Sequence, residues 1–317
     1  MEPQTLSIYA LIVVGAAGIG LGVCSSSFTF DSTRLIRPLA YLVILCLCGV
    51  ALRRIGYPRF GGFSEALAQL SALSCTAAWC TTLLAATSLP FADGTLTKAD
   101  AIVFFGFDWR SLLPFIATHD RVVTGLSYVY ASLSWQPTLI LLALFTAGQP
   151  SRSWAFILAW GLTLAACTAI FPFVPALGTY LHYGIAPSDV PGVHVAAAWR
   201  HIELLLPVRQ GSVRSISPDT LYGIVTFPSF HAAGAVLLGW AGWTLGLLRW
   251  PFVLLNVMMF GSALVIGGHY LIDLAAGGAV AAGAVLVSAR VTKRLGQPLP
   301  ATGVNDAYST QSRPMSR

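Results

Sequence analysis

Two short motifs near the C-terminal end of the chain combine residue types that can do phosphoryl chemistry. They read Pro228-Ser229-Phe230-His231 and His269-Tyr270-Leu271-Ile272-Asp273. Both lie at the edge of long apolar runs, where an ionisable side chain is costly and therefore usually functional. Two histidines and one carboxylate can move a phosphoryl group through a covalent intermediate. This combination favours an enzyme whose active site is embedded in a membrane.

The second motif has the spacing of a histidine–carboxylate pair on one helix face. Residues four apart on a helix are neighbours, so Asp273 can reach the ring of His269. A carboxylate that accepts the Nδ1 hydrogen fixes the tautomer and leaves Nε2 as a nucleophile or base. The alternative is a structural hydrogen bond that ties two helices together.

The first motif has the residues of a helix start. Proline suits the first turn of a helix, and Ser229 would place a hydroxyl beside the unpaired backbone amides. Such an N-terminus attracts phosphate through its amides and its dipole. His231 would lie within reach of a departing oxygen. The alternative is an ordinary helix start that happens to carry a histidine.

The composition predicts an all-α, polytopic membrane helix bundle. Of the 317 residues, 56% are hydrophobic and only 9% are charged, whereas soluble domains carry about 25% charged residues. Apolar runs of about twenty residues are long enough to cross a bilayer as helices. We expect eight spans, at 6–23, 38–52, 66–89, 126–147, 154–172, 229–248, 251–266 and 270–289.

The charge distribution indicates a membrane partner and not nucleic acid, although the net charge is +6. With a cytoplasmic N-terminus, the inner segments collect most of the basic residues, as the positive-inside rule requires. Both motifs then face outward. The basic residues expected inside are Arg53, Arg54, Arg59, Arg152, Arg249, Arg290, Lys293, Arg294, Arg313 and Arg317.

Two outer segments are longer than simple connections need to be. Residues 101–110, within the segment 90–125, mix aromatic and charged residues and suit an interfacial or re-entrant helix. Residues 193–206, within the segment 173–227, suit an amphipathic helix on the bilayer surface. A covering loop without any ligand role is the alternative in both places.

The motifs together resemble the type 2 phosphatidic acid phosphatase superfamily of membrane enzymes. Residues 223–232 and 267–273 look more like its inositolphosphotransferase branch, which includes inositol phosphorylceramide synthases, and so does Phe171-Pro172 ahead of Gly178-Thr179-Tyr180. The resemblance implies a six-helix core. We therefore divide the chain into two additional N-terminal helices (1–60), the core (61–290) and a disordered cytoplasmic tail (291–317).

The resemblance also implies a role for each motif residue. His269 attacks phosphorus and becomes phosphohistidine, Asp273 orients and stabilises it, and His231 protonates the leaving group. Water or an alcohol then attacks the phosphoenzyme with His231 acting as base. No metal or cofactor is implied, provided that positive groups neutralise the phosphoryl oxygens.

One departure from the superfamily pattern concerns phosphate binding. The pattern has Ser-Arg six residues before the catalytic histidine, where this chain has Ser262 and Ala263. We expect Arg209 and Arg214 to replace the missing arginine. Alternatively, these two contact lipid headgroups or solvent.

Further residues complete the predicted site and its surroundings. Ser229, Gly268 and Tyr180 are expected beside the substrate. Polar roles at the membrane interface are expected of His182, His194 and His201.

Several functions fit these residues. The first is a phosphotransferase that passes a head group or phosphodiester to a lipid alcohol acceptor, and the second is a monoesterase acting on phosphatidate, isoprenyl or sphingoid phosphates. A transporter or scramblase, using histidine and aspartate as an ion relay, is a rival from another class, and a purely structural membrane protein is a fourth. The compact loops favour a bacterial inner membrane, with the site facing the periplasm.

Overall fold

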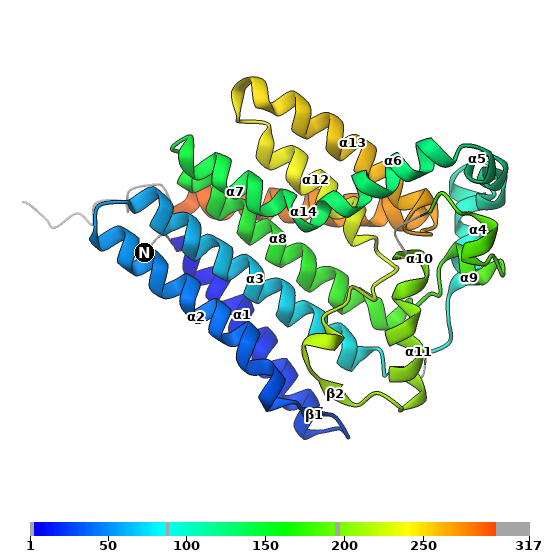
Figure 1. Cartoon of the computed structure of the whole chain (residues 1–317), viewed down its shortest axis with the longest axis horizontal. Coiled ribbons are helices and arrows are strands. Elements are labelled where there is room, and N and C mark those ends of the chain that lie inside the picture. The colour runs from blue at the N-terminus through cyan, green and yellow to red at the C-terminus, as the bar shows by residue number, and fades with distance from the viewer. Residues whose placement is uncertain (1–2, 87–88, 194–196, 296–317) are drawn as a thin grey trace, which may run out of the picture.

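The computed structural model describes residues 3–86, 89–193 and 197–295, and this part of the chain is almost entirely helical (Figure 1). The α-helices are α1 (Pro3–Cys24), α2 (Ser32–Arg54), α3 (Pro58–Leu84), α4 (Asp93–Val103), α5 (Leu113–Thr118), α6 (Asp120–Ala131), α7 (Gln136–Thr146), α8 (Pro150–Ile170), α9 (Thr179–His182), α10 (Ala197–Arg200), α11 (Ile202–Gln210), α12 (Phe230–Gly242), α13 (Arg249–Val265) and α14 (Leu271–Leu295). Two short strands, β1 (Thr29–Phe30) and β2 (Ser215–Ile216), pair in parallel.

The all-α membrane architecture is confirmed, and the number of spans is corrected. Within the described ranges, six helices are long and apolar enough to cross a bilayer, namely α1, α2, α3, α8, α13 and α14, and there are seven spans if the bent pair of α6 and α7 is counted as one. The expected span 126–147 is a pair of helices, α6 and α7, bent by 57°. The expected span 229–248 contains α12, whose 13 residues reach only about 20 Å, less than the ~30 Å hydrocarbon core.

The three N-terminal helices form one side of the molecule (Figure 1). Asp31 caps α2 by accepting a hydrogen bond from the backbone of Arg34, and Pro58 opens α3 in its first turn, where its missing N–H costs nothing. Helix α2 lies along α3, while α1 packs against both α3 and α8. These contacts attach the N-terminal helices to the rest of the bundle.

The centre of the bundle is where α8, α12 and α14 meet. Fully buried apolar side chains from the three helices fill it, among them Phe156, Leu237 and Ala281. Small residues let the backbones approach closely, as is typical of membrane helices. At Gly277 of α14 a Cβ atom would overlap the carbonyl oxygen of Ser229, just before α12. This contact fixes α14 against the start of α12.

The two outer segments form a layer of short helices at one end of the bundle (Figure 1). The first contains α4, which ends at Val103, and a 3-10 turn at Trp109–Leu112. In the second, the expected helix 193–206 is replaced by two short helices, α10 and α11, and residues 194–196 with His194 lie outside the described residues. The expected tail also lies outside them from residue 296 onward.

Candidate active site

The first motif forms the start of α12, one position later than expected. Ser229 is the N-cap, and its hydroxyl oxygen accepts a hydrogen bond from the backbone N–H of Ala232 at 3.3 Å. Pro228, joined to Phe227 by a cis peptide bond, precedes the cap and is therefore not in the first turn. His231 is the second residue of the helix. Ser229 is fully buried, and its hydroxyl caps the helix through this hydrogen bond.

The second motif pairs His269 with Asp273 as predicted, but His269 lies in the loop just before α14 and not on the same helix face. Nδ1 of His269 lies 3.2 Å from Oδ2 of Asp273, and both side chains are almost fully buried. An ionised carboxylate can only accept, so Nδ1 carries the hydrogen and Nε2 keeps a lone pair. The backbone N–H of Tyr270 donates to the same oxygen at 3.0 Å. The imidazole is therefore held in the tautomer that a nucleophile at Nε2 needs.

A carboxylate from another helix, Asp100, binds the backbone of the second motif. Asp100 of α4 accepts hydrogen bonds from the backbone N–H groups of Leu271 at 2.9 Å and Ile272 at 2.7 Å. These amides begin α14, where a helix has unpaired donors and a positive dipole end. Burial raises the pKa of Asp100, while the two hydrogen bonds oppose that rise. Asp100 therefore anchors the helix start that carries Asp273.

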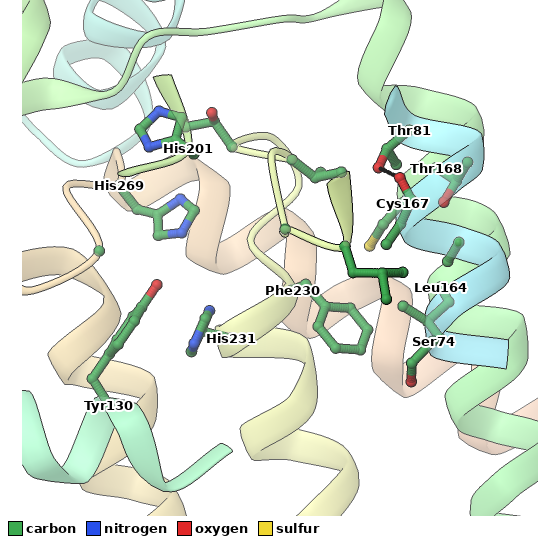
Figure 2. Close-up of a pocket in the computed structure, with 17 residues that line it drawn as sticks. Ser74, Thr81, Tyr130, Leu164, Cys167, Thr168, His201, Phe230, His231 and His269 are labelled. Atoms are coloured by element: carbon green, nitrogen blue, oxygen red, sulfur yellow. Dashed lines mark hydrogen bonds between the residues drawn. The ribbon is translucent and has the colours of Figure 1, made fainter. Parts of the chain in front are cut away.

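The two motif histidines line one cavity of about 290 Å³, which we call the histidine cavity. Figure 2 shows three imidazole rings along one side of it, with His269 between His201 and His231 in that view. The opposite wall carries small or apolar side chains from α3 and α8, including Ser74, Thr81, Leu164, Cys167 and Thr168. A group held in this cavity can thus meet His231 and His269 together.

Aromatic packing restricts the ring of His231. The ring stacks on Tyr130 of α6 with centroids 3.7 Å apart and an angle of 12° between the planes. Gly267 completes this corner, because a Cβ there would come within 2.7 Å of the His269 ring and 3.0 Å of Tyr130. The rings of His269 and Tyr130 therefore leave no room for a side chain at position 267. His231 is therefore positioned by packing and not by a carboxylate of its own.

His201 is a site residue that the sequence did not reveal. It was expected to be an interfacial polar residue, yet its ring lines the histidine cavity, and its Nε2 lies 2.9 Å from the carbonyl oxygen of Leu177. Asp93 of α4 orders that loop by accepting from the backbone N–H groups of Leu177 and Gly178 at 3.0 to 3.1 Å. The hydroxyl of Tyr270 also donates to Asp93, at 2.9 Å. One buried carboxylate thus connects the loop that His201 contacts with Tyr270, the neighbour of His269.

Gly268 and Tyr180 shape the site without lining the cavity. Gly268 has a positive φ of 63°, and its carbonyl oxygen accepts from the N–H of Thr179 at 2.8 Å. Tyr180 is fully buried, donates its hydroxyl to the carbonyl of Val265 at 2.7 Å and packs edge-on to Trp109. Burial also raises the pKa of the Tyr180 phenol. Gly268 belongs to the loop that presents His269, and Tyr180 packs against that loop.

The structure places the two expected phosphate-binding arginines away from the histidine cavity. Arg209 donates to the carbonyl oxygen of Leu89 and lies over the ring of Phe91, 4.3 Å from its centroid. Arg214 donates to the carbonyl oxygen of Val208 and lies 5.0 Å from the ring centre of Phe28. Neither is among the residues that line the cavity.

A different arginine, Arg200, lines a second cavity that His231 also lines. This space of about 830 Å³, the arginine cavity, is lined by Arg200, Tyr222 and His231 and by residues of α2, α3, α6 and α7. It shares Ser74, Tyr130 and His231 with the histidine cavity. Arg200 donates to the hydroxyl of Tyr222 and lies 4.4 Å from its ring centre. No sequence motif marks Arg200, because its position depends on how α10 folds against the bundle.

The comparisons with known proteins bear on the same residues. A search of curated proteins found no match, and a search of solved structures found none either. A family profile described as the PAP2 superfamily matches residues 95–287, which is more than half of the chain and includes both histidine motifs. The matched region contains α12, α14 and the histidine pair, whereas α1, α2 and α3 precede it. The chain therefore belongs to the PAP2 superfamily, whose members are generally phosphatases or phosphotransferases.

Proposed function

We propose that the chain is a lipid phosphotransferase that works through a phosphohistidine at His269. The observation that carries the proposal is the shared cavity, in which His231 and the Asp273-paired ring of His269 line one wall. A covalent intermediate needs a nucleophile with a free lone pair and a second group that handles protons. The two histidines meet these requirements.

The reaction divides into two balanced steps. In the first step, Nε2 of His269 attacks phosphorus, the bond between phosphorus and the leaving oxygen breaks, and His231 gives that oxygen a proton. In the second step, an acceptor hydroxyl gives its proton to His231 and attacks phosphorus, and the bond to His269 breaks. Asp273, bonded to Nδ1, stabilises the positive charge that the His269 ring gains.

The charge on the phosphate group of the substrate is our reason for proposing phosphodiester transfer instead of phosphomonoester hydrolysis. The superfamily arginine is absent at Ala263, and among the residues that line either cavity in the described ranges, Arg200 is the one cation that is always charged. A monoester dianion needs more positive charge than a diester does. A phosphodiester donor and a lipid alcohol acceptor therefore suit this site better. This choice agrees with the resemblance to the inositolphosphotransferase branch and its sphingolipid enzymes.

The membrane orientation that we propose for the chain follows from the distribution of its basic residues. Basic residues concentrate in the segments that the expected topology places inside, which puts the histidine motifs at the outer face. We propose a bacterial inner membrane, with the active site facing the periplasm at the level of the outer leaflet.

A panel of lipid substrates tests the proposal. Purified protein is incubated with phosphodiester and phosphomonoester lipids, with and without a lipid alcohol, and the products are separated by chromatography. A new phospholipid is expected only when the acceptor is present, together with an acid-labile phosphoprotein that His269→Ala lacks. Release of free phosphate, unaffected by the acceptor, would make the chain a monoesterase. Lipid movement between leaflets without turnover would support a scramblase and refute the proposal.

A further inference from the structure

A third cavity lies on the opposite side of α3 from the arginine cavity. This space of about 540 Å³, which we call the glycine groove, is bounded by α1, α3 and α8. Its size is within the range of about 300–1,000 Å³ that ligand sites occupy. Three glycines of α1, Gly15, Gly18 and Gly22, form one wall. Since the family match begins at residue 95, two of the three walls come from the part of the chain that precedes it.

The glycine groove adjoins the histidine cavity. Ala77 of α3 and Leu164 and Thr168 of α8 line both spaces, so these three side chains need to move aside to connect them. Leu164 and Thr168 lie across the cavity from the histidines in Figure 2. A molecule whose reactive group meets His231 and His269 can therefore extend past these three residues into the groove.

The lining chemistry identifies the kind of molecule that fits. None of the lining residues is charged, and the polar ones are small, namely Ser25, Ser26, Thr76, Cys80 and Thr168. The lining residues on α1 run from Leu11 to Gly22, a distance of about 17 Å along a helix. One leaflet of bilayer hydrocarbon is about 15 Å thick. The groove is thus long enough and apolar enough for a lipid tail.

We infer that the glycine groove seats the hydrocarbon chain of the lipid phosphate substrate while its phosphoryl group occupies the histidine cavity. This inference rests on the proposed function and adds the place where the substrate's tail is recognised. The three lining residues shared with the histidine cavity argue for a substrate chain instead of an unrelated bilayer lipid. The N-terminal helix α1 then contributes to substrate selection and not only to anchoring.

Two substitutions on α1 form a matched pair that tests the groove. Gly18 lines the groove, whereas Gly20 does not, and a Cβ at either position would have nothing within 4 Å. Gly18→Phe adds a side chain on the groove wall from an unobstructed Cβ position, and Gly20→Phe adds the same side chain outside the groove. Displacing even two methylene groups costs about tenfold in binding. We expect Gly18→Phe to lower kcat/KM about tenfold for long-chain substrates and progressively less as the chain is shortened, and Gly20→Phe to have no effect.

A binding measurement separates failure of this inference from failure of the proposed function. A long-chain lipid phosphate with a photoreactive group at the end of its chain should label α1 in the wild type and in Gly20→Phe but much less in Gly18→Phe. If α1 is labelled in this pattern without any turnover, the groove is supported and the proposed function fails. Equal labelling of both variants, equal labelling by a diacylglycerol without phosphate, or losses of kcat/KM that do not depend on chain length would overturn the inference.

Discussion

The backbone N–H of Ser229 donates a hydrogen bond to the carbonyl oxygen of Asp273, with a donor–acceptor distance of 3.0 Å. This bond joins the start of α12 to the first turn of α14, and each of these segments carries one of the two histidine motifs. His231 follows Ser229 by two residues, and His269 precedes Asp273 by four. One main-chain contact therefore sets how far apart the two reactive rings lie.

The first prediction tests that contact through the residue one turn further along α14. Gly277→Ala places a methyl group on the carbonyl oxygen of Ser229, so α12 and α14 must separate. Overpacking of this kind costs about 1–3 kcal/mol. We expect a lower melting temperature in detergent and a loss of turnover. The control is Gly283→Ala on the same helix, where a Cβ has open space. If Gly277→Ala kept the melting temperature and turnover of the wild type, close contact between α12 and α14 would not be needed for stability or activity.

The second prediction concerns the nucleophile. His269→Ala should reduce kcat by at least about a thousandfold, because the covalent route is lost, while thermal unfolding stays close to that of the wild type. His182→Ala is the control, since His182 is exposed on α9 and does not line the histidine cavity. Phosphoprotein formation is followed with labelled substrate. Continued labelling in His269→Ala would assign the nucleophile to another residue.

The histidine motifs could be predicted from the sequence because their residues lie close together along the chain. His269 lies in the loop two residues before α14 and Asp273 in the first turn of that helix, so the geometry of the pair depends on five consecutive residues of the chain. His201 and Arg200 are different, because they depend on residues far from the motifs: His201 contacts the loop that Asp93 holds from more than eighty residues away, and Arg200 contacts Tyr222. The bend between α6 and α7 had a local signal in Pro137, close to the break. Hydropathy alone registers such a bent pair as one continuous span.

The third prediction separates the carboxylate's function from that of the ring. Asp273→Asn keeps a side chain of the same shape, but its amide can donate to Nδ1 of His269 and favour the wrong tautomer. We expect kcat to fall about 10²–10⁴-fold with a measurable residual rate, and phosphoprotein to form slowly. A rate equal to that of the wild type would reduce Asp273 to a structural residue.

The fourth prediction decides which arginine neutralises phosphate. Arg200→Gln should lower kcat/KM by about tenfold or more, because a charge-assisted hydrogen bond to phosphate is worth about 1.5–3 kcal/mol. Arg209→Gln is the matched control, because Arg209 contacts Leu89 and Phe91 and lines neither the histidine cavity nor the arginine cavity. Activity is measured across a range of substrate concentrations. The opposite ranking of the two variants would restore the expectation drawn from the sequence.

The fifth prediction uses two aspartates whose pKa values shift in opposite directions. Burial raises the pKa of Asp100, so the folded chain holds that proton more tightly than the unfolded chain does. The linked stabilisation is complete below the unfolded pKa of about 3.9 and is lost as the pH rises through the folded pKa. We therefore expect the melting temperature of the wild type to fall relative to that of Asp100→Asn between about pH 4 and pH 7.

Asp108 supplies the control of opposite sign. Hydrogen bonds from Arg110 lower the pKa of Asp108, so its stabilisation is present above the unfolded pKa and is lost as the pH falls through the folded pKa. The wild type should therefore gain stability relative to Asp108→Asn as the pH rises from acidic values. Asp108 is largely exposed, so this change should be small and should weaken with added salt. If both variants changed in the same direction, the carboxylate of Asp100 would not be carrying a burial cost at the start of α14.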